Sequence, residues 1–214
     1  GGVIMRILLL CLLFSFTGLV HGKTLVIGDS VFALSGEIKR ELERLSGLDI
    51  DSNATSGSKM LSWTGFTPPI PTQYARVNRS YDTVVMNGGG NDVLIGNSNR
   101  CGSPLSDYCK DLLLRVNQRV VTLMQDMVDD GVELIIYMGY YHLPPPRSRL
   151  DESTDFGTEI MKEACERIEA NCIVVSPLDA FEGQSGLVGA DGVHPTTKGS
   201  RLLAKLVWEK WSEA

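Results

Sequence analysis

Short apolar runs alternate along this chain with longer segments whose apolar residues recur at helical spacing. The apolar runs, which predict strands, cover residues 23–27, 48–52, 83–87, 133–138 and 172–175. The segments that predict helices cover residues 31–46, 106–130, 155–170 and, opened by Pro195, 195–211. Strands that alternate with helices form parallel sheets with helices on both faces. The chain is therefore predicted to be an α/β fold of three α/β/α layers around a mostly parallel, five-stranded sheet.

Four polar segments follow the predicted strands or the long loop after the last of them. They are Asp29-Ser30, Ser56-Gly57-Ser58, Asn91-Asp92 and the stretch from Asp191 to His194. In open parallel sheets, ligands bind beyond the carboxyl ends of the strands. We therefore expect these four segments to converge on one site.

Ser30 lies where a predicted strand ends and a predicted helix begins. At such a turn the hydroxyl can project outward, while the backbone N–H and the helix dipole favour a developing negative charge. This arrangement suits a nucleophile, but the same position also favours a serine that only caps the helix. Position alone does not decide between the two.

His194 favours the nucleophile. It lies in the segment Asp191-Gly192-Val193-His194-Pro195, so a tight turn can bring the Asp191 carboxylate to its Nδ1–H. That contact would fix the tautomer, stabilise the imidazolium and leave Nε2 free for Ser30. A lone histidine is more often structural, but this spacing predicts a general base.

Asn91 and Gly57 are the predicted donors to an oxyanion. Asn91 follows a strand and three glycines, which allow backbone and substrate to approach closely. Its side-chain amide can donate a hydrogen bond, although a simple turn asparagine is the alternative. The Gly57 backbone N–H is the further donor, with Ser56 or Ser58 as alternatives one position away.

Taken together, these segments resemble the four signature blocks of the SGNH hydrolases, the GDSL-like esterases and lipases. The matching residues are Gly28-Asp29-Ser30, Gly57, Gly89-Gly90-Asn91-Asp92 and Asp191-Gly192-Val193-His194-Pro195. The residues in these blocks are most similar to those of the small bacterial thioesterase, lysophospholipase and arylesterase group. Two details differ: valine stands where the family name has leucine, and the second block is one residue shorter.

The resemblance implies a flavodoxin-like sheet and a catalytic triad of Ser30, His194 and Asp191. It also implies an oxyanion hole made by the Ser30 and Gly57 backbone amides and the Asn91 side chain. No metal or organic cofactor is implied. The implied reaction is hydrolysis of a carboxylic ester through an acyl-enzyme.

The substrate is outlined only by the loops. Trp63, Tyr140 and His142 are the candidate substrate contacts, and residues 143–155 are a candidate lid. A small-molecule ester or lipid-like substrate is expected: short-chain or aryl acyl esters, with thioesters and lysophospholipids as further options. Aromatic side chains bind sugars as well as acyl chains, so a carbohydrate O-acetyl esterase is the alternative. A non-catalytic binding module of the same fold is a third reading.

The N-terminal stretch MRILLLCLLFSFTGLVHG places Arg6 ahead of an apolar run and small residues near Gly22. This pattern is typical of a secretory signal peptide, and the run is short for a membrane anchor, which is the alternative. We expect residues 1–22 to contain the signal with its upstream residues and 23–214 to form a single domain. The expected protein is exported, periplasmic or secreted, with no stable membrane insertion after cleavage.

Four cysteines lie beyond the predicted signal: Cys101, Cys109, Cys165 and Cys172. An even number in an oxidising compartment predicts two disulfides, with three pairings possible. Local closure, which pairs the first two and the last two, is the simplest. Unpaired buried thiols are the alternative. A zinc site is not expected, because no CxxC pair or nearby histidine accompanies these cysteines.

The overall charge argues against a nucleic-acid partner. The formal net charge is −6, and no run of lysine or arginine stands out. Binding to phosphates requires a concentrated basic surface. We expect a monomer that acts on a small molecule.

Overall fold

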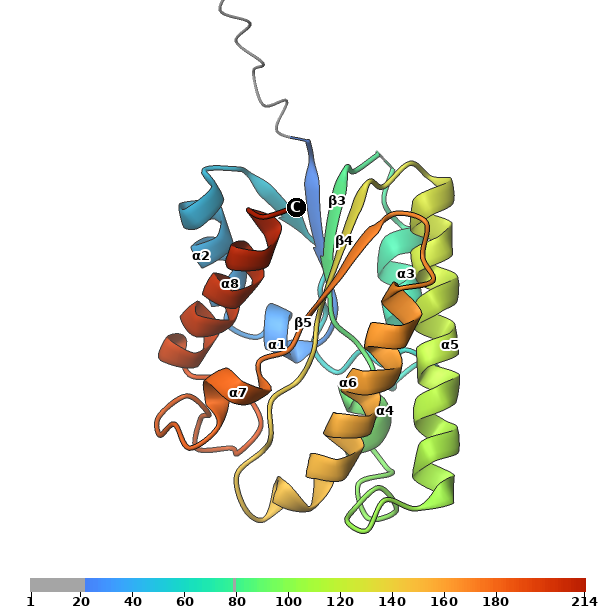
Figure 1. The fold of residues 1–214 in the computed structure, drawn as a ribbon, viewed down its shortest axis with the longest axis vertical. Coiled ribbons are helices and arrows are strands. Elements are labelled where there is room, and N and C mark those ends of the chain that lie inside the picture. The colour runs from blue at the N-terminus through green and yellow to red at the C-terminus, as the bar shows by residue number, and fades with distance from the viewer. Residues whose placement is uncertain (1–21, 79) are drawn as a thin grey trace, which may run out of the picture.

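The computed structural model describes residues 22–78 and 80–214. Five strands form one sheet in the order β2-β1-β3-β4-β5, and every neighbouring pair is parallel (Figure 1). The strands are β1 (Thr24–Ile27), β2 (Ile50–Ser52), β3 (Thr83–Met86), β4 (Leu134–Met138) and β5 (Asn171–Val175). This is the flavodoxin-like order. The predicted fold class is confirmed, and the sheet is parallel throughout.

Helices cover both faces of the sheet (Figure 1). One layer contains α1 (Ser30–Ala33), α2 (Glu37–Ser46), α7 (Leu178–Phe181) and α8 (Thr197–Trp211). The other contains α3 (Ile70–Ala75), α4 (Gly90–Leu94), α5 (Asp107–Asp129) and α6 (Asp151–Cys165). A short 3-10 helix, η1 (Arg147–Leu150), leads into α6.

Two apolar cores explain why the strands read as continuous apolar runs. Leu25 and Ile27 of β1 pack into the core beneath α5 and α6, whereas Val26 packs into the core beneath α2 and α8. Successive side chains on a strand point to opposite faces, so a strand covered on both sides is buried at every position and is mostly apolar. All four residues of β1 and of β3 are buried.

Three predicted helix boundaries are corrected by the structure. The predicted helix 31–46 is two helices, because Gly36 adopts a left-handed conformation with φ of 63° between α1 and α2. The last helix begins at Thr197 rather than Pro195, because the Thr196 side chain caps it by accepting from the Gly199 N–H. Helix α6 begins at Asp151 rather than 155, with two acidic residues in its first turn, where the helix dipole favours them.

The early start of α6 also changes the candidate lid. Within residues 143–155, η1 and the first turn of α6 are helical. This segment is therefore partly continuous with α6, and η1 contacts α6. Whether it moves as a lid stays a prediction.

The four cysteines are paired by local closure. Cys101 is bonded to Cys109, with 5.0 Å between their Cα atoms, and Cys165 to Cys172, with 5.2 Å. The first disulfide joins the loop before α5 to its first turns, and the second joins the end of α6 to β5. Apart from Gly22, the predicted signal segment lies outside the described residues.

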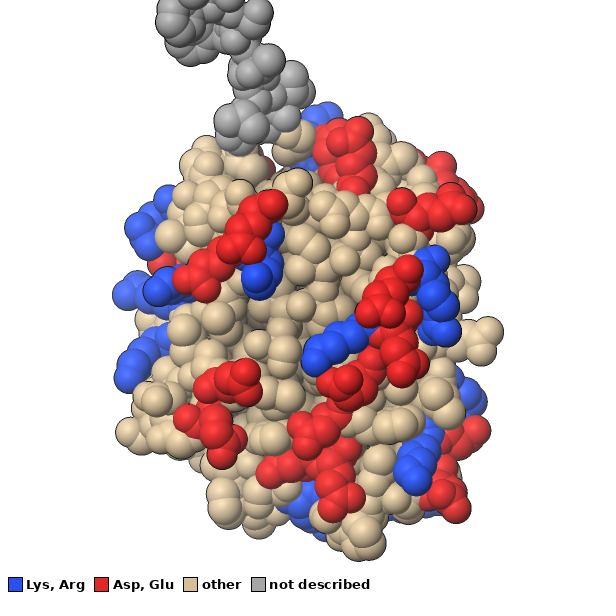
Figure 2. All heavy atoms as spheres, viewed as in Figure 1, with Lys and Arg blue, Asp and Glu red and all other residues tan. Residues whose placement is uncertain are grey.

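The surface of the described residues mixes both signs of charge. Figure 2 shows acidic side chains interspersed with lysine and arginine on the face that it presents. Within residues 22–78 and 80–214, no helix combines the length and the apolar character needed to cross a membrane.

Candidate active site

Ser30 is held at the first residue of α1 by the turn that follows β1. Asp29 caps this helix, its Oδ1 accepting from the Val31 N–H at 2.9 Å. Gly28 makes the turn possible, because a Cβ on it would lie 1.9 Å from the Asn87 side-chain oxygen. Only glycine fits such a close approach. The Ser30 N–H therefore points out of the first turn of α1, where backbone N–H groups lack helical partners.

A continuous hydrogen-bonded chain joins Ser30, His194 and Asp191. Ser30 Oγ lies 2.8 Å from His194 Nε2, and His194 Nδ1 lies 2.6 Å from Asp191 Oδ2. Ser30 and Asp191 therefore contact the two different nitrogens of the same imidazole ring. This is the geometry in which a carboxylate fixes the tautomer that can accept a proton from a serine.

Asp191 is held as an anion. Its Oδ1 accepts from the backbone N–H groups of Val193 and His194, both at 2.9 Å. The hydrogen bond from the His194 side chain, and then these two backbone bonds, lower the pKa of Asp191 to about 2. A charged carboxylate beside an imidazole stabilises the protonated form of that imidazole.

The loop that carries His194 is fixed from outside by two residues of the segment after β4. The Arg147 Nη1 donates to the Asp191 carbonyl at 2.9 Å, and the Tyr141 hydroxyl donates to the Val193 carbonyl at 2.7 Å. Tyr141 in turn stacks on Phe181 with 4.3 Å between ring centroids. Sequence reasoning did not assign this role to Arg147 or Tyr141, because these contacts span 44 and 52 positions along the chain.

Asp29 connects the nucleophile turn to neighbouring elements. Its carboxylate accepts from the Asn87 side chain at 2.9 Å and from the Tyr140 hydroxyl at 2.6 Å. Burial raises the pKa of Asp29, and the bonds from Tyr140, Val31 and Asn87 oppose that shift. These contacts agree with a structural role for Asp29, which fixes the turn that presents Ser30.

Asn91 occupies the second position of α4, beside the nucleophile turn. Its Nδ2 donates to the Ser58 carbonyl at 3.0 Å. An amide nitrogen carries two hydrogens, so one remains for a substrate oxygen. Asn91 and Ser30 line the same cavity. The neighbouring Asp92 accepts from the Met60 and Leu61 backbone N–H groups and so ties α4 to this segment.

The second block forms a tight turn. The Ser58 N–H donates to the Thr55 carbonyl at 3.2 Å, and Gly57 has φ of 80° at the third position. This position of a type II turn requires a positive φ and therefore favours glycine. Because the Ser58 N–H is used within the turn, Ser58 is a poor oxyanion donor. Gly57, with Ser56 as its neighbour, stays the predicted donor.

Of the three candidate substrate contacts, one lines the cavity beside Ser30 and two do not. Tyr140 lines the cavity beside Ser30. Trp63 does not line it and is 54% exposed on a surface loop. His142 also lies outside the lining, where its Nε2 contacts Asp155 Oδ1 at 2.8 Å and its Nδ1 lies 3.8 Å from Glu182.

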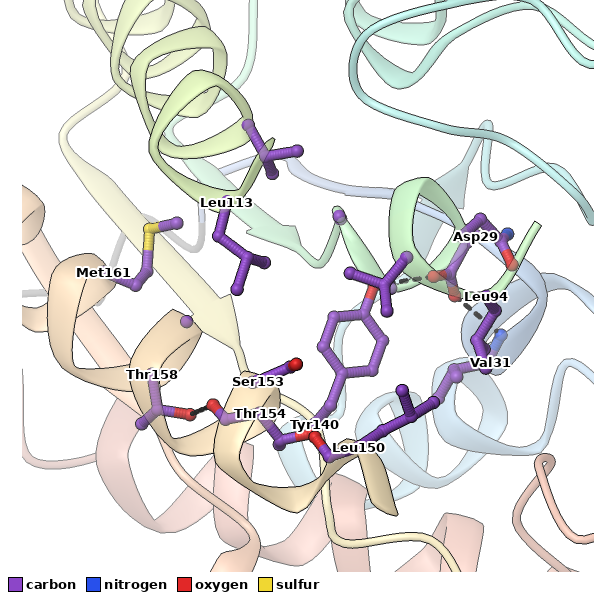
Figure 3. Close-up of a pocket in the computed structure, with 18 of the residues that line it drawn as sticks. Asp29, Val31, Leu94, Leu113, Tyr140, Leu150, Ser153, Thr154, Thr158 and Met161 are labelled. Atoms are coloured by element: carbon purple, nitrogen blue, oxygen red, sulfur yellow. Dashed lines mark hydrogen bonds between the residues drawn. The ribbon is translucent and has the colours of Figure 1, made fainter. Parts of the chain in front are cut away.

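The cavity beside Ser30 has a volume of about 100 Å³ and reaches between α5 and α6 (Figure 3). Most side chains that line it beyond the catalytic end are apolar, among them Leu113, Val116, Leu150, Ile160, Met161 and Val174. Sequence reasoning placed Leu113 and Val116 on the apolar face of the helix predicted at 106–130 and missed the cavity. Their helical spacing predicts an inner face but not whether the opposing faces touch.

The described residues offer no group of three or more His, Cys, Asp or Glu side chains placed to bind a metal ion.

Comparison with solved structures identifies the architecture. No protein-family model matches the sequence, and no curated protein matches it. An acetylxylan esterase from Geobacillus stearothermophilus is 17% identical, with 89% of this chain and 94% of that chain covered and a TM-score of 0.67. A lipase from a goat rumen metagenome is 16% identical, with 87% of this chain and 96% of that chain covered and a TM-score of 0.66. A protein from Slackia heliotrinireducens, described as an SGNH hydrolase, is 20% identical, with 87% of this chain and 97% of that chain covered and a TM-score of 0.62.

The chain has the SGNH-hydrolase fold. In this SGNH-hydrolase architecture the loops after β1, β3 and β5 meet at the carboxyl edge of the sheet. They bring Ser30, Asn91 and His194 together from positions up to 164 residues apart.

Proposed function

We propose that this protein is a serine esterase that hydrolyses carboxylic esters, with Ser30 as nucleophile, His194 as general base and Asp191 as the residue that orients it. The observation that carries the proposal is the unbroken contact chain, 2.8 Å from Ser30 to His194 and 2.6 Å from His194 to Asp191. A binding module would not need this geometry. The shared SGNH-hydrolase fold and the four sequence blocks support the same reading.

In the first half-reaction, Ser30 Oγ attacks the ester carbonyl while His194 Nε2 takes the hydroxyl proton. The carbonyl oxygen becomes an oxyanion, which receives hydrogen bonds from the Ser30 N–H, the second Asn91 amide hydrogen and the Gly57 N–H. Collapse of this intermediate breaks the bond to the alcohol oxygen, and His194 returns its proton to the leaving alcohol. The acyl group remains on Ser30.

In the second half-reaction, water replaces the alcohol. His194 takes a proton from the water as its oxygen attacks the acyl carbonyl, and the same donors stabilise the second oxyanion. The acid leaves when the bond to Ser30 breaks, and His194 returns the proton to Ser30 Oγ. The site is then in its starting state.

The alternative substrate is an acetylated carbohydrate. One of the structural neighbours is an acetylxylan esterase, and this chain carries exposed aromatic side chains on the loop before α3. Trp63 is 54% exposed and Phe66 is fully exposed, which suits stacking on a sugar ring. The fold is common to both substrate classes, so substrate assays must separate them.

The test is hydrolysis of p-nitrophenyl acetate, butyrate and octanoate by the wild type, Ser30→Ala and Ser35→Ala. We expect Ser30→Ala to lose essentially all activity. Ser35→Ala, a control at an exposed serine after α1, should keep it. Release of acetate from acetylated xylan in the same preparations tests the alternative. Wild-type activity that survives in Ser30→Ala would exclude the proposed mechanism.

We also infer that the protein is exported. Two disulfides within the domain fit an oxidising compartment. The test is expression of the full chain in a bacterium, followed by fractionation and N-terminal sequencing. A mature protein that begins near Lys23 outside the cytoplasm is the expected result, and an uncleaved cytoplasmic chain is the contrary one.

A further inference from the structure

The cavity beside Ser30 has two ends of different character. The catalytic end is lined by Asp29, Ser30, Asn91 and Val193. The inner end lies between α5 and α6 and is lined by Leu113, Val116, Ile160, Met161 and Val174. Figure 3 shows the Tyr140 ring between these ends, with Leu113 and Met161 on one side and Asp29 and Leu94 on the other.

The polar side chains at the inner end have protein partners. The Asn117 amide donates to the Ile160 carbonyl at 3.0 Å, and the Thr158 hydroxyl donates to the Thr154 carbonyl at 2.9 Å. The Ser153 hydroxyl donates to the Cys101 carbonyl at 2.6 Å. With these groups satisfied, the inner end offers an apolar ligand a lining that does not require replacement hydrogen bonds.

Gly157 keeps this space open. It lies within α6 and lines the cavity, and the nearest atom to a Cβ built on it is Leu113 Cδ2 at 3.9 Å. A helix with glycine in its interior is less stable than the same helix with alanine, and a side chain would fit at Gly157, so packing alone does not account for the glycine. A role in leaving the cavity open for a ligand does account for it. A single water needs roughly 10–15 Å³, so about 100 Å³ has room for several methylene groups.

The Tyr140 ring lies between the two ends of the cavity. Its hydroxyl is fixed on Asp29 Oδ2 at 2.6 Å, and its ring lies against Gly90, where a Cβ would come within 2.8 Å of Cζ. The same Asp29 caps the helix that begins with Ser30. Asp29 therefore fixes the position of the Tyr140 ring relative to Ser30.

We propose that the inner end of this cavity receives the acyl chain of the substrate, with Gly157 and Tyr140 as specificity-determining residues. The inference rests on the proposed esterase function and makes its substrate class a medium-chain acyl ester. Each methylene that leaves water for an apolar site raises kcat/KM roughly fourfold. We therefore expect octanoyl esters to exceed acetyl esters by at least tenfold in kcat/KM.

The test fills the cavity from α6. Gly157→Leu should lower the ratio of kcat/KM for p-nitrophenyl octanoate to kcat/KM for p-nitrophenyl acetate at least tenfold, because the long acyl chain needs the filled space and the acetyl group needs less of it. Gly157→Ala should have a smaller effect in the same direction. Glu163→Leu adds the same side chain at an exposed position of α6 and is the matched control. It should leave both substrates unchanged.

The outcomes separate this inference from the esterase proposal. Loss of octanoate activity with acetate activity retained supports the cavity as the acyl site. An unchanged octanoate to acetate ratio in Gly157→Leu overturns it while leaving the esterase proposal intact. A wild type that hydrolyses none of the three p-nitrophenyl esters (acetate, butyrate and octanoate) counts against the esterase proposal instead.

A second measurement covers the case in which Gly157→Leu does not fold. Linear alkylboronic acids form reversible adducts with an active serine, and their inhibition constants are measured against p-nitrophenyl acetate on the wild type. The constants should fall at least tenfold from methyl to heptyl. A series that is flat with chain length would overturn the inference.

Discussion

At the scale of single residues, a few hydrogen bonds define the site. Ser30, His194 and Asp191 were predictable because each occupies a short motif whose spacing has a chemical reason. The residues that hold the triad loop were not predictable. Arg147 and Tyr141 reach it through side-chain contacts between segments far apart in sequence, and no local pattern encodes such contacts.

The pH dependence of activity follows from the triad. Only a neutral imidazole can take the Ser30 proton, so kcat/KM should rise with pH through the mildly acidic range. Asp191, with its pKa lowered to about 2, remains charged throughout this range, so its titration adds no further change to the pH profile of kcat/KM there. A flat kcat/KM profile across this range would contradict the role of His194.

The same carboxylate affects stability at lower pH. A depressed pKa means that the folded state favours the charged form of Asp191, which stabilises the fold above the ordinary value of 3.8. This contribution is lost as the pH falls from there toward 2. Circular dichroism over the same pH series should therefore show a folded protein where activity has already declined.

Asn91→Ala should reduce kcat by roughly a hundredfold or more, because one preorganised oxyanion donor is lost. KM for the ester should change little, since the donor acts mainly on the developing negative charge. Asn99→Ala, at an exposed position on the loop after α4, is the control and should retain full activity. If Asn91→Ala keeps its turnover and its melting temperature, the oxyanion donor lies elsewhere.

At the scale of elements, burial on both faces explains what the sequence predicts well. The five strands lie within two residues of their predicted bounds. The central strands β1, β3 and β4 are mostly apolar because helices cover both of their faces, whereas the edge strand β2 has one buried residue. Helix ends were less predictable. They depend on caps such as Thr196 and on the left-handed Gly36, which compete with the apolar pattern.

The Cys165–Cys172 disulfide joins α6 to β5 and should contribute to stability at this scale. Replacing both cysteines by alanine should lower the free energy of unfolding by about 2 kcal/mol, near the lower end for disulfides because the loop is short. The melting temperature should then fall by roughly 4–8 °C. A melting temperature equal to that of the wild type would show that the pair adds no stability.

The thiol count gives an independent check of both bonds. The unfolded chain should show no reactive thiol from Cys101, Cys109, Cys165 or Cys172 until reductant is added. Cys11 contributes one thiol if the N-terminal segment is retained. Four further thiols without reductant would contradict the pairing.

At the scale of the whole molecule, topology makes the site. The strand order places the loops after β1, β3 and β5 at one edge of the sheet, so motifs separated by more than half of the chain meet there. The alternation of strands and helices was sufficient to predict this convergence. It was not sufficient to predict the cavity between α5 and α6, which depends on how far apart two apolar faces pack and on Gly157 within one of them.

In the proposed mechanism, Ser30 is the nucleophile of an esterase that forms an acyl-enzyme. The most direct measurement is reaction of the protein with a fluorophosphonate, followed by mass spectrometry of its peptides. We predict one adduct on the peptide that contains Ser30, a greatly slowed reaction in His194→Ala, and no adduct in Ser30→Ala. An adduct on another residue, or none on the folded wild type, would contradict the account.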